Sequence, residues 1–428
     1  MIRILAIVAA LAGLAAAIAL DAPTPGGSPA ASATFASDPR TLPAVCPGAQ
    51  TIPVGDIQSG DAELDSGSDE VDFTVLPEGG EVIDGGASFE GVGMSLERIG
   101  TGDIAGLAGM ACAPTSRDQW LVGGSTELGA SARLVLSNPA DTSVRAEVAL
   151  HTPVGAVEGV TSVVIGPGSQ RVVLLEAIEP EMPAVAAHIT AGGLGVSAAI
   201  QDSRLEGFTP AGSDWVTASA LGEALAVPVP AESDGDGGAT LTLIAPDGAQ
   251  VDLAMATDQG ELTWIGESAL TLEPGVLTEI PVPQAGPGTV LIDSSAPVAA
   301  ASRVRVGRDA AAAGEGVQAF DFAWSGSQAR ADARERAVIV PPGEVSLQVH
   351  ADAAGTVDFD ADGEAVTVTV EEGGSAIAPL DLEAGVRLSS TAEATWSLVV
   401  TDDPGFLTSI EPVSVELSSV DTTVTVGG

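Results

Sequence analysis

The stretch Ala365-Val366-Thr367-Val368-Thr369-Val370 alternates valine with threonine over its last five residues. A period of two places the valines on one face of an extended strand and the threonines on the other. The same alternation occurs in Thr240-Leu241-Thr242-Leu243-Ile244 and in Arg145-Ala146-Glu147-Val148-Ala149-Leu150. Gly, Pro, Asp and Ser interrupt such runs about every ten residues, which is typical of antiparallel sandwiches. The sequence therefore predicts an all-β protein.

A longer repeat is superimposed on the strand pattern. Residues 167–174, 274–281 and 373–380 resemble one another, and each stretch is followed by a pair of predicted strands. A unit of about 100 residues matches an immunoglobulin-like sandwich in length, so we expect tandem units of this kind. A β-propeller in which each unit forms two blades is the alternative.

Three tryptophans, Trp120, Trp215 and Trp324, are interpreted as markers at the approach to each unit. The repeat and the composition together predict a division of the chain into segments. These are a signal peptide or membrane anchor at 1–20, a flexible spacer at 21–41, a disulfide-closed N-terminal β region at 42–117, and sandwich units at 118–212, 213–320 and 321–428.

The first twenty residues predict export. Met1-Ile2-Arg3 is a short basic start, and residues 4–20 are uninterrupted apolar sequence. As a helix this run reaches roughly 25 Å, just short of the ~30 Å hydrocarbon core of a bilayer. Ala17-Ile18-Ala19 has the small-residue pattern that a signal peptidase cleaves. The protein is therefore expected at the cell envelope if the segment is retained as an anchor, or secreted if it is cleaved.

The charge of the chain excludes several classes of function. It contains 15 Lys+Arg and 59 Asp+Glu, a net charge of −44 at pH 7, and every basic residue is arginine. Such a negative field repels phosphate backbones and anionic lipid, so neither nucleic acid nor a membrane surface is an expected partner. Only the N-terminal segment is expected to contact a membrane. Without lysine, the chain can form neither a Schiff base nor a P-loop.

The two cysteines, Cys46 and Cys112, predict one disulfide. An even number of cysteines in an exported protein indicates a disulfide bridge, because the compartment is oxidising. Closing a loop of this size stabilises a fold by roughly 4 kcal/mol on the chain-entropy account. Neither cysteine has a neighbouring histidine or basic residue that would lower its pKa and make it reactive.

Five short motifs carry a resemblance to a known family. They are Cys46-Pro47-Gly48, Cys112, Leu136-Ser137-Asn138-Pro139, Gln201-Asp202-Ser203-Arg204 and Gly212-Ser213-Asp214-Trp215. With them, the chain resembles a family of exported, membrane-anchored actinobacterial proteins of unknown function that are often encoded near glycosyltransferases. The resemblance implies an envelope location and a link to envelope glycans. It implies no site residues.

Asp358, Asp360 and Asp362 place carboxylates at alternate positions before Gly363, like the first half of a calcium-binding EF-hand loop. The position of the bidentate glutamate is occupied by Thr369. A β-hairpin that turns at Asp362-Gly363 explains the same residues and is the preferred interpretation.

One polar cluster is the candidate interaction site: Asp202, Arg204, Asp214 and Trp215. We expect Asp202 and Arg204 to pair with Asp214 and to fix the junction between the first two repeats. A structural role comes first in this interpretation and a binding role second.

No catalytic constellation is found in the sequence, and neither a resident metal nor a cofactor is predicted. The three histidines lack ligand spacing, and no Gly-x-Ser-x-Gly elbow occurs. We therefore expect a non-enzymatic, envelope-associated scaffold or interaction module whose partner is an envelope protein or glycan, with a role in glycan assembly as one option. The alternative is a secreted glycan-binding or glycan-processing enzyme.

Overall fold

The computed structural model describes the chain in segments. These are residues 31–36, 40–52, 67–68, 70–207, 209–231, 238–264, 268–282, 287–308, 318–330, 332–403, 405–414, 417–418 and 421–426. The described part is all-β, as predicted, with a single 3-10 turn at Leu175–Ala177. The predicted leader and most of the predicted spacer lie outside it. Within the described residues, no helix has the length and apolar character needed to cross a membrane.

The chain divides into two compact units, Met1–Arg40 with Ser418–Gly428, and Thr41–Leu417. In the smaller unit, β1 (Ala31–Ala36) pairs antiparallel with β39 (Asp421–Val426), so that Ala31 lies opposite Val426. Strand β1 falls within the predicted spacer. The larger unit contains the repeats, and everything that follows concerns it.

The first repeat consists of two antiparallel sheets. Its strands are β10 (Asp118–Val122), β11 (Ala130–Asn138), β12 (Val144–Thr152), β13 (Gly155–Ala156), β14 (Thr161–Ile165), β15 (Ser169–Leu174), β16 (Ala186–Ala191), β17 (Ser197–Glu206), β18 (Thr209–Val216) and β19 (Ala218–Ser219). One sheet has the order β13-β12-β16-β10-β19, with β14 also paired to β12, and the other β15-β11-β17-β18. Both contribute to one apolar core, for example Val148 from β12 and Leu134 from β11.

The second repeat has the same strand order. Its strands are β20 (Gly222–Val229), β21 (Ala239–Ile244), β22 (Ala249–Thr257), β23 (Gly260–Thr263), β24 (Ala269–Leu272), β25 (Leu277–Pro281), β26 (Gly288–Arg308), β27 (Ala319–Gly326) and β28 (Gln328–Ala329). The first half of the long strand β26 pairs with β20 and β22, and its second half pairs with β21 and β27. Strand β26 therefore occupies the places of both β16 and β17.

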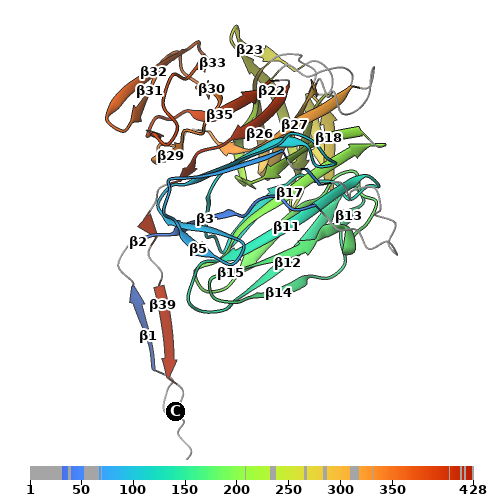
Figure 1. Ribbon diagram of the computed structural model, residues 1–428, viewed down its shortest axis with the longest axis vertical. Helices are drawn as coiled ribbons and strands as arrows, with labels where there is room; N and C mark the ends of the chain where they lie inside the picture. Colours follow the sequence, from blue (N-terminus) through green and yellow to red (C-terminus); the bar gives the residue numbers. More distant parts are fainter. Residues whose placement is uncertain are drawn as a thin grey trace, which may run out of the picture. The chain divides into compact units, whose positions relative to one another are not determined.

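The third repeat follows the same plan once more. Its strands are β29 (Arg336–Ile339), β30 (Glu344–His350), β31 (Gly355–Ala361), β32 (Glu364–Val370), β33 (Ser375–Pro379), β34 (Arg387–Ser390), β35 (Thr395–Asp402), β36 (Phe406–Ile410) and β37 (Val413–Ser414). The sheets are β32-β31-β34-β29-β37 and β33-β30-β35-β36. Strands β31 and β32, which contain the alternating valines, form the hairpin labelled in Figure 1.

The predicted sequence repeat coincides with this structural repeat. Residues 167–174, 274–281 and 373–380 contain β15, β25 and β33, which occupy the same edge position in their sheets. The tryptophan markers were partly wrong. Trp215 and Trp324 lie on equivalent strands, β18 and β27, whereas Trp120 lies on β10, the first strand of its repeat. The boundary predicted between residues 212 and 213 falls inside β18.

The N-terminal region is a shortened version of the same unit. Its strands are β3 (Pro43–Pro47), β4 (Val71–Leu76), β5 (Glu81–Ile83), β6 (Gly86–Glu90), β7 (Met94–Ile99), β8 (Gly106–Ala111) and β9 (Ala113–Pro114). The sheets are β5-β6-β3-β9 and β4-β7-β8. The predicted disulfide is confirmed, since Cys46 on β3 is bonded to Cys112, which directly follows β8.

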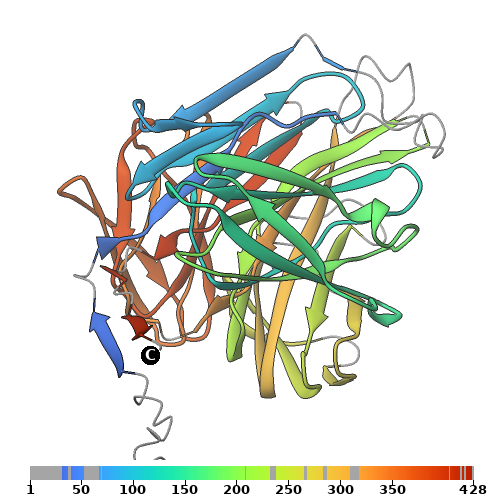
Figure 2. The same ribbon diagram turned by 90° about the horizontal axis from the view of Figure 1, so that it is seen from below.

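The four units make their most extensive contacts with one another through one strand each. Strand β8 contacts β18 and β36, and β27 contacts the same two strands, so that the contacts close a ring. Figures 1 and 2 show β18 beside β27 where the green and orange parts of the chain meet. We call β8, β18, β27 and β36 the inner strands. Nearly every residue on them is buried, in contrast to the alternating burial of an outer strand such as β12.

Candidate functional site

Two buried carboxylates lie among the inner strands. Asp214 on β18 and Asp321 on β27 are both fully buried. Burying a charged carboxylate is costly unless hydrogen bonds compensate for the lost water. The neighbouring inner strands supply these hydrogen bonds.

Asp214 joins three inner strands. Its Oδ2 accepts the backbone N–H of Trp324 on β27 at 2.8 Å, and its Oδ1 accepts the hydroxyl of Thr408 on β36 at 2.9 Å. The Thr408 hydroxyl oxygen in turn accepts the backbone N–H of Gly109 on β8 at 3.0 Å. One aspartate and one threonine thus connect all four units.

Asp321 forms a second connection. Its Oδ2 accepts the backbone N–H of Leu107 on β8 at 3.0 Å and that of Leu407 on β36 at 3.1 Å. Its Oδ1 is buried without a hydrogen-bond partner among the described residues. Around this oxygen the packing is tight, because a Cβ atom placed on Gly212 would lie 2.8 Å from it.

Burial controls the charge of this region. It raises the pKa of Asp321 to about 7, against the opposing effect of the backbone N–H donors, and it raises that of Asp214 well above its usual value. Asp321 also repels the Asp214 carboxylate and adds to this rise. Nearby on β7, burial raises the pKa of Glu97 to about 7, although Glu97 accepts the backbone N–H of Gln50.

The predicted interaction cluster forms a different set of bonds from the expected one. Arg204 donates to Asp202 at 2.9 Å, and the expected pair between Arg204 and Asp214 is not formed. Asp202 on β17 and Asp214 on β18 lie opposite each other in the sheet, and both accept hydrogen bonds from Trp324 of the second repeat. The indole Nε1 of Trp324 donates to Asp202 at 2.9 Å. Trp215 is buried in a small core with Ala108 and Met110 of β8 and so contacts the N-terminal region.

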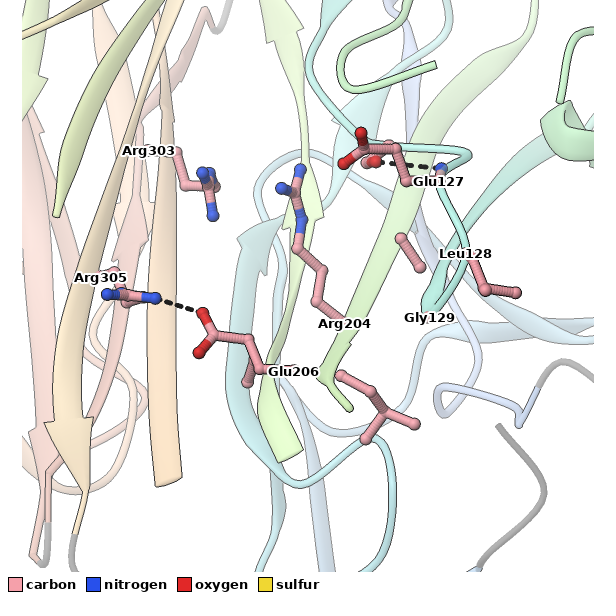
Figure 3. Close-up of a pocket in the computed structure, with 11 residues that line it drawn as sticks. Glu127, Leu128, Gly129, Arg204, Glu206, Arg303 and Arg305 are labelled. Atoms are coloured by element: carbon pink, nitrogen blue, oxygen red, sulfur yellow. Dashed lines mark hydrogen bonds and ion pairs between the residues drawn. The ribbon is translucent and has the colours of Figure 1, made fainter. Parts of the chain in front are cut away.

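A cleft opens beside this cluster, between the first and second repeats. It has a volume of about 200 Å³ and is lined by residues 125, 127–130, 204–206, 211, 303 and 305. Figure 3 shows Arg303 and Arg305 extending from β26 towards Arg204 and Glu206 on β17. Three of the chain's fifteen arginines therefore line one small cavity.

The three arginines differ in their partners. Arg305 forms an ion pair with Glu206, and its guanidinium lies 4.1 Å from the centre of the Phe320 ring. Arg204 is bound to Asp202. Within the part of the chain that the structure describes, Arg303 has no hydrogen bond to a carboxylate, and its guanidinium lies 5.9 Å from the centre of the Phe322 ring. Burial, with repulsion from Arg204, lowers the pKa of Arg303 to about 9 against the attraction of Asp202 and Glu279, so the group is still charged at neutral pH.

The three aspartates considered as calcium ligands belong to the third repeat. Asp358 and Asp360 lie on the exposed face of β31, and Asp362 occupies the turn. Each carboxylate has its own partner: Asp358 accepts from the Thr367 hydroxyl, Asp360 from the Gly363 backbone and Asp362 from the Arg387 backbone. Over the described residues, no three acidic, histidine or cysteine side chains are arranged to hold a metal ion.

Sequence reasoning missed Asp321, Arg303 and Arg305. The sequence does contain a signal for the two arginines. Ser302-Arg303-Val304-Arg305 lies in the second repeat at the place that corresponds to Asp202-Ser203-Arg204 in the first repeat. For Asp321 there was no such signal, because inner strands are buried on both faces and lose the alternation of polar and apolar residues.

The fold and the site together define a disulfide-containing, all-β repeat protein with an arginine-lined cleft between repeats. The sequence pattern of DUF5719, a family of unknown function, matches residues 82–391. The chain belongs to this family. The match confirms one part of the resemblance seen in the sequence, namely that the relatives form a family of unknown function.

Comparison with curated proteins gave no match. Two solved structures show weak similarity, each at 12% identity. One concerns host cell surface retention of a 1.5-MDa bacterial ice-binding adhesin and covers 76% of this chain and 89% of that chain, with a TM-score of 0.09. The other is a Ca2+-stabilized adhesin of an Antarctic bacterium and covers 94% of this chain and 99% of that chain, with a TM-score of 0.11. Scores this low carry no argument about this protein.

Proposed function

We propose that the protein is exported and acts at the cell envelope as a non-enzymatic scaffold or interaction module. The observation that carries the proposal is the use of Asp214 and Asp321. Both carboxylates accept hydrogen bonds from other inner strands, so they hold repeats together. Neither lines the cleft. Such a body presents a fixed surface to a partner, which suits a scaffold.

The repeats are proposed to be immunoglobulin-like sandwiches. In support, each repeat has about the length of such a domain and two antiparallel sheets over a shared core. The four units would then be positioned outside the membrane by the segment at 1–20, either as an anchor or after its cleavage.

An extracellular position is supported by the disulfide between Cys46 and Cys112, because such bonds persist in oxidising compartments. The proposed partner is an envelope protein or a glycan, in keeping with the resemblance to envelope proteins encoded near glycosyltransferases. The net charge of −44 favours partners other than nucleic acid and anionic lipid.

A secreted glycan-processing enzyme is the second candidate. Carboxyl groups with raised pKa values are the usual general acids of glycoside hydrolysis, and Asp321 is such a group. Against this role, Asp321 is fully buried, and its Oδ2 is occupied by two backbone N–H donors.

The test is fractionation of cells that produce the full chain, with and without detergent, combined with thiol labelling. We expect the protein in the detergent-released membrane fraction or in the medium, with Cys46 and Cys112 protected from the label. A variant lacking residues 1–20 is the control and should stay inside the cell. Recovery of the full chain in the cytosol with both thiols labelled would contradict the proposal.

A further inference from the structure

The cleft between the first and second repeats has a small volume, and not every arginine in it is paired with an acidic side chain. Arg204 and Arg305 already have acidic partners, Asp202 and Glu206. Among the described residues, Arg303 forms no ion pair and no hydrogen bond with a carboxylate, and the Nε of Arg305 is buried without a hydrogen bond.

A half-buried guanidinium without a carboxylate is unfavourable for folding alone. Removing a cation from water costs free energy that only an opposite charge or good hydrogen bonds return. Arg204 and Arg305 repel the charge of Arg303, whereas Asp202 and Glu279 attract it without forming an ion pair with it. A residue that destabilises its surroundings in this way is expected where a ligand supplies the missing charge.

The acidic residues around the cleft limit what can bind. Glu206 and Glu127 belong to its lining, and the Glu279 carboxylate is close enough to act electrostatically on Arg303. These carboxylates repel a ligand that is negative throughout, but they accept hydrogen bonds from hydroxyl groups. A cavity of about 200 Å³ is also smaller than the ~300–1,000 Å³ typical of sites for drug-sized ligands.

We propose that the cleft binds one acidic sugar unit, with its carboxylate or phosphate on Arg303 and its hydroxyl groups on Glu206 and Glu127. The planar guanidinium fork matches either anion through two parallel N–H donors. This inference deepens the proposed role at the envelope, because acidic sugars would there be units of the partner glycan.

The experiment is calorimetric titration of the purified disulfide-bonded protein with four probes: glucuronate, glucose 6-phosphate, inorganic phosphate and glucose. We expect saturable binding at one site for glucuronate or glucose 6-phosphate, weaker binding of inorganic phosphate, and no binding of glucose. The sugar that binds more tightly shows whether the site prefers a carboxylate or a phosphate. Arg303→Gln should weaken binding by about tenfold or more, the loss expected for a charge-assisted hydrogen-bond pair.

Two further variants make the result interpretable. Arg171→Gln removes an exposed arginine on β15, away from the cleft, and should bind like the parent. Arg303→Lys keeps the charge without the fork and should bind with intermediate affinity. The unliganded Arg303→Gln protein should unfold at the same or a higher temperature than the parent, since an unfavourable charge is removed.

The inference is wrong if no acidic sugar binds, if Arg303→Gln and Arg171→Gln bind alike, or if Arg303→Gln and Arg303→Lys both lower the melting temperature. Each of these results leaves the proposed envelope location intact, because the fractionation experiment tests it separately.

Discussion

The hydroxyl of Thr408 on β36 donates a hydrogen bond of 2.9 Å to the carboxylate of Asp214 on β18, which precedes it by 194 residues. The same hydroxyl accepts the backbone N–H of Gly109. This contact joins the third repeat to the first repeat and to the N-terminal region, and both of its residues are fully buried. A side chain that satisfies two buried groups on two other units is expected to matter for stability out of proportion to its size.

Replacing Thr408 by valine should therefore destabilise the protein by about 2 kcal/mol, because the variant keeps the shape of the side chain but leaves Asp214 and the Gly109 N–H without this partner. Denaturant unfolding monitored by tryptophan fluorescence measures the change. Thr367→Val is the matched control. It removes a hydroxyl bonded to the exposed Asp358, and we expect a change within about 0.5 kcal/mol. Equal effects for the two variants would contradict a connecting role for Thr408.

The buried carboxylates predict an unusual dependence of stability on pH. A folded-state pKa raised above the unfolded value means that the folded protein binds more protons, so the stabilisation is complete at acidic pH and is lost as pH rises. For Asp321 and Glu97 the loss occurs between about 4 and about 7. We expect the melting temperature to fall by roughly 5 °C from about pH 5 to about pH 8.

Asp321→Asn separates this effect from the general repulsion of a chain with net charge −44. The amide cannot ionise, so the variant should show a smaller decrease of melting temperature over the same range. An unchanged pH dependence would show that Asp321 is not one of the groups responsible.

Gly212 is predicted to be intolerant of any side chain. Its φ of +107° favours glycine, and a Cβ would lie 2.6 Å from the Phe322 ring. Gly155 provides the control, with a φ of +119° and open space around the position. Gly155→Ala should cost about 1–2 kcal/mol from backbone strain alone, and Gly212→Ala several kcal/mol more from the clash. Thermal unfolding that ranks the two variants equally would contradict the tight packing of the inner strands.

The hairpin interpretation of Asp358, Asp360 and Asp362 makes a separate prediction. Because each carboxylate already accepts a hydrogen bond from the protein, adding millimolar calcium in place of chelator should leave the melting temperature unchanged. A rise of several degrees that disappears in Asp360→Asn would instead identify this turn as a calcium site.

Much of the fold could be predicted from the sequence, because polar and apolar residues alternate along the outer strands. Strand β32 alternates burial with each residue, and the edge strands β15 and β33 recur at similar places in the repeat. The long strand β26 and the inner strands could not be found in this way. The inner strands are buried on both faces, so their residues follow the contacts between units and not a period of two. Strand β26 has two buried stretches separated by a partly exposed segment at 293–297, so it looks like two separate strands in the sequence.

The candidate site was only half predictable for the same reason. Asp202, Arg204 and Asp214 stand out as polar residues at the end of the first repeat, and they do lie together. Their partners Trp324 and Thr408 come from the second and third repeats, and no local pattern indicates such distant contacts. Arg303 could have been connected to Arg204, because the two residues lie at corresponding places in the sequence repeat.

We infer that this protein binds an acidic glycan through Arg303 without processing it. The most direct measurement is incubation of the purified protein with an acidic envelope polysaccharide, recording bound polymer and newly released reducing ends together. We expect binding that is lost in Arg303→Gln and retained in Arg171→Gln, with no new reducing ends from any of the three proteins. Release of reducing ends that stops on substitution of a single carboxylate would contradict it.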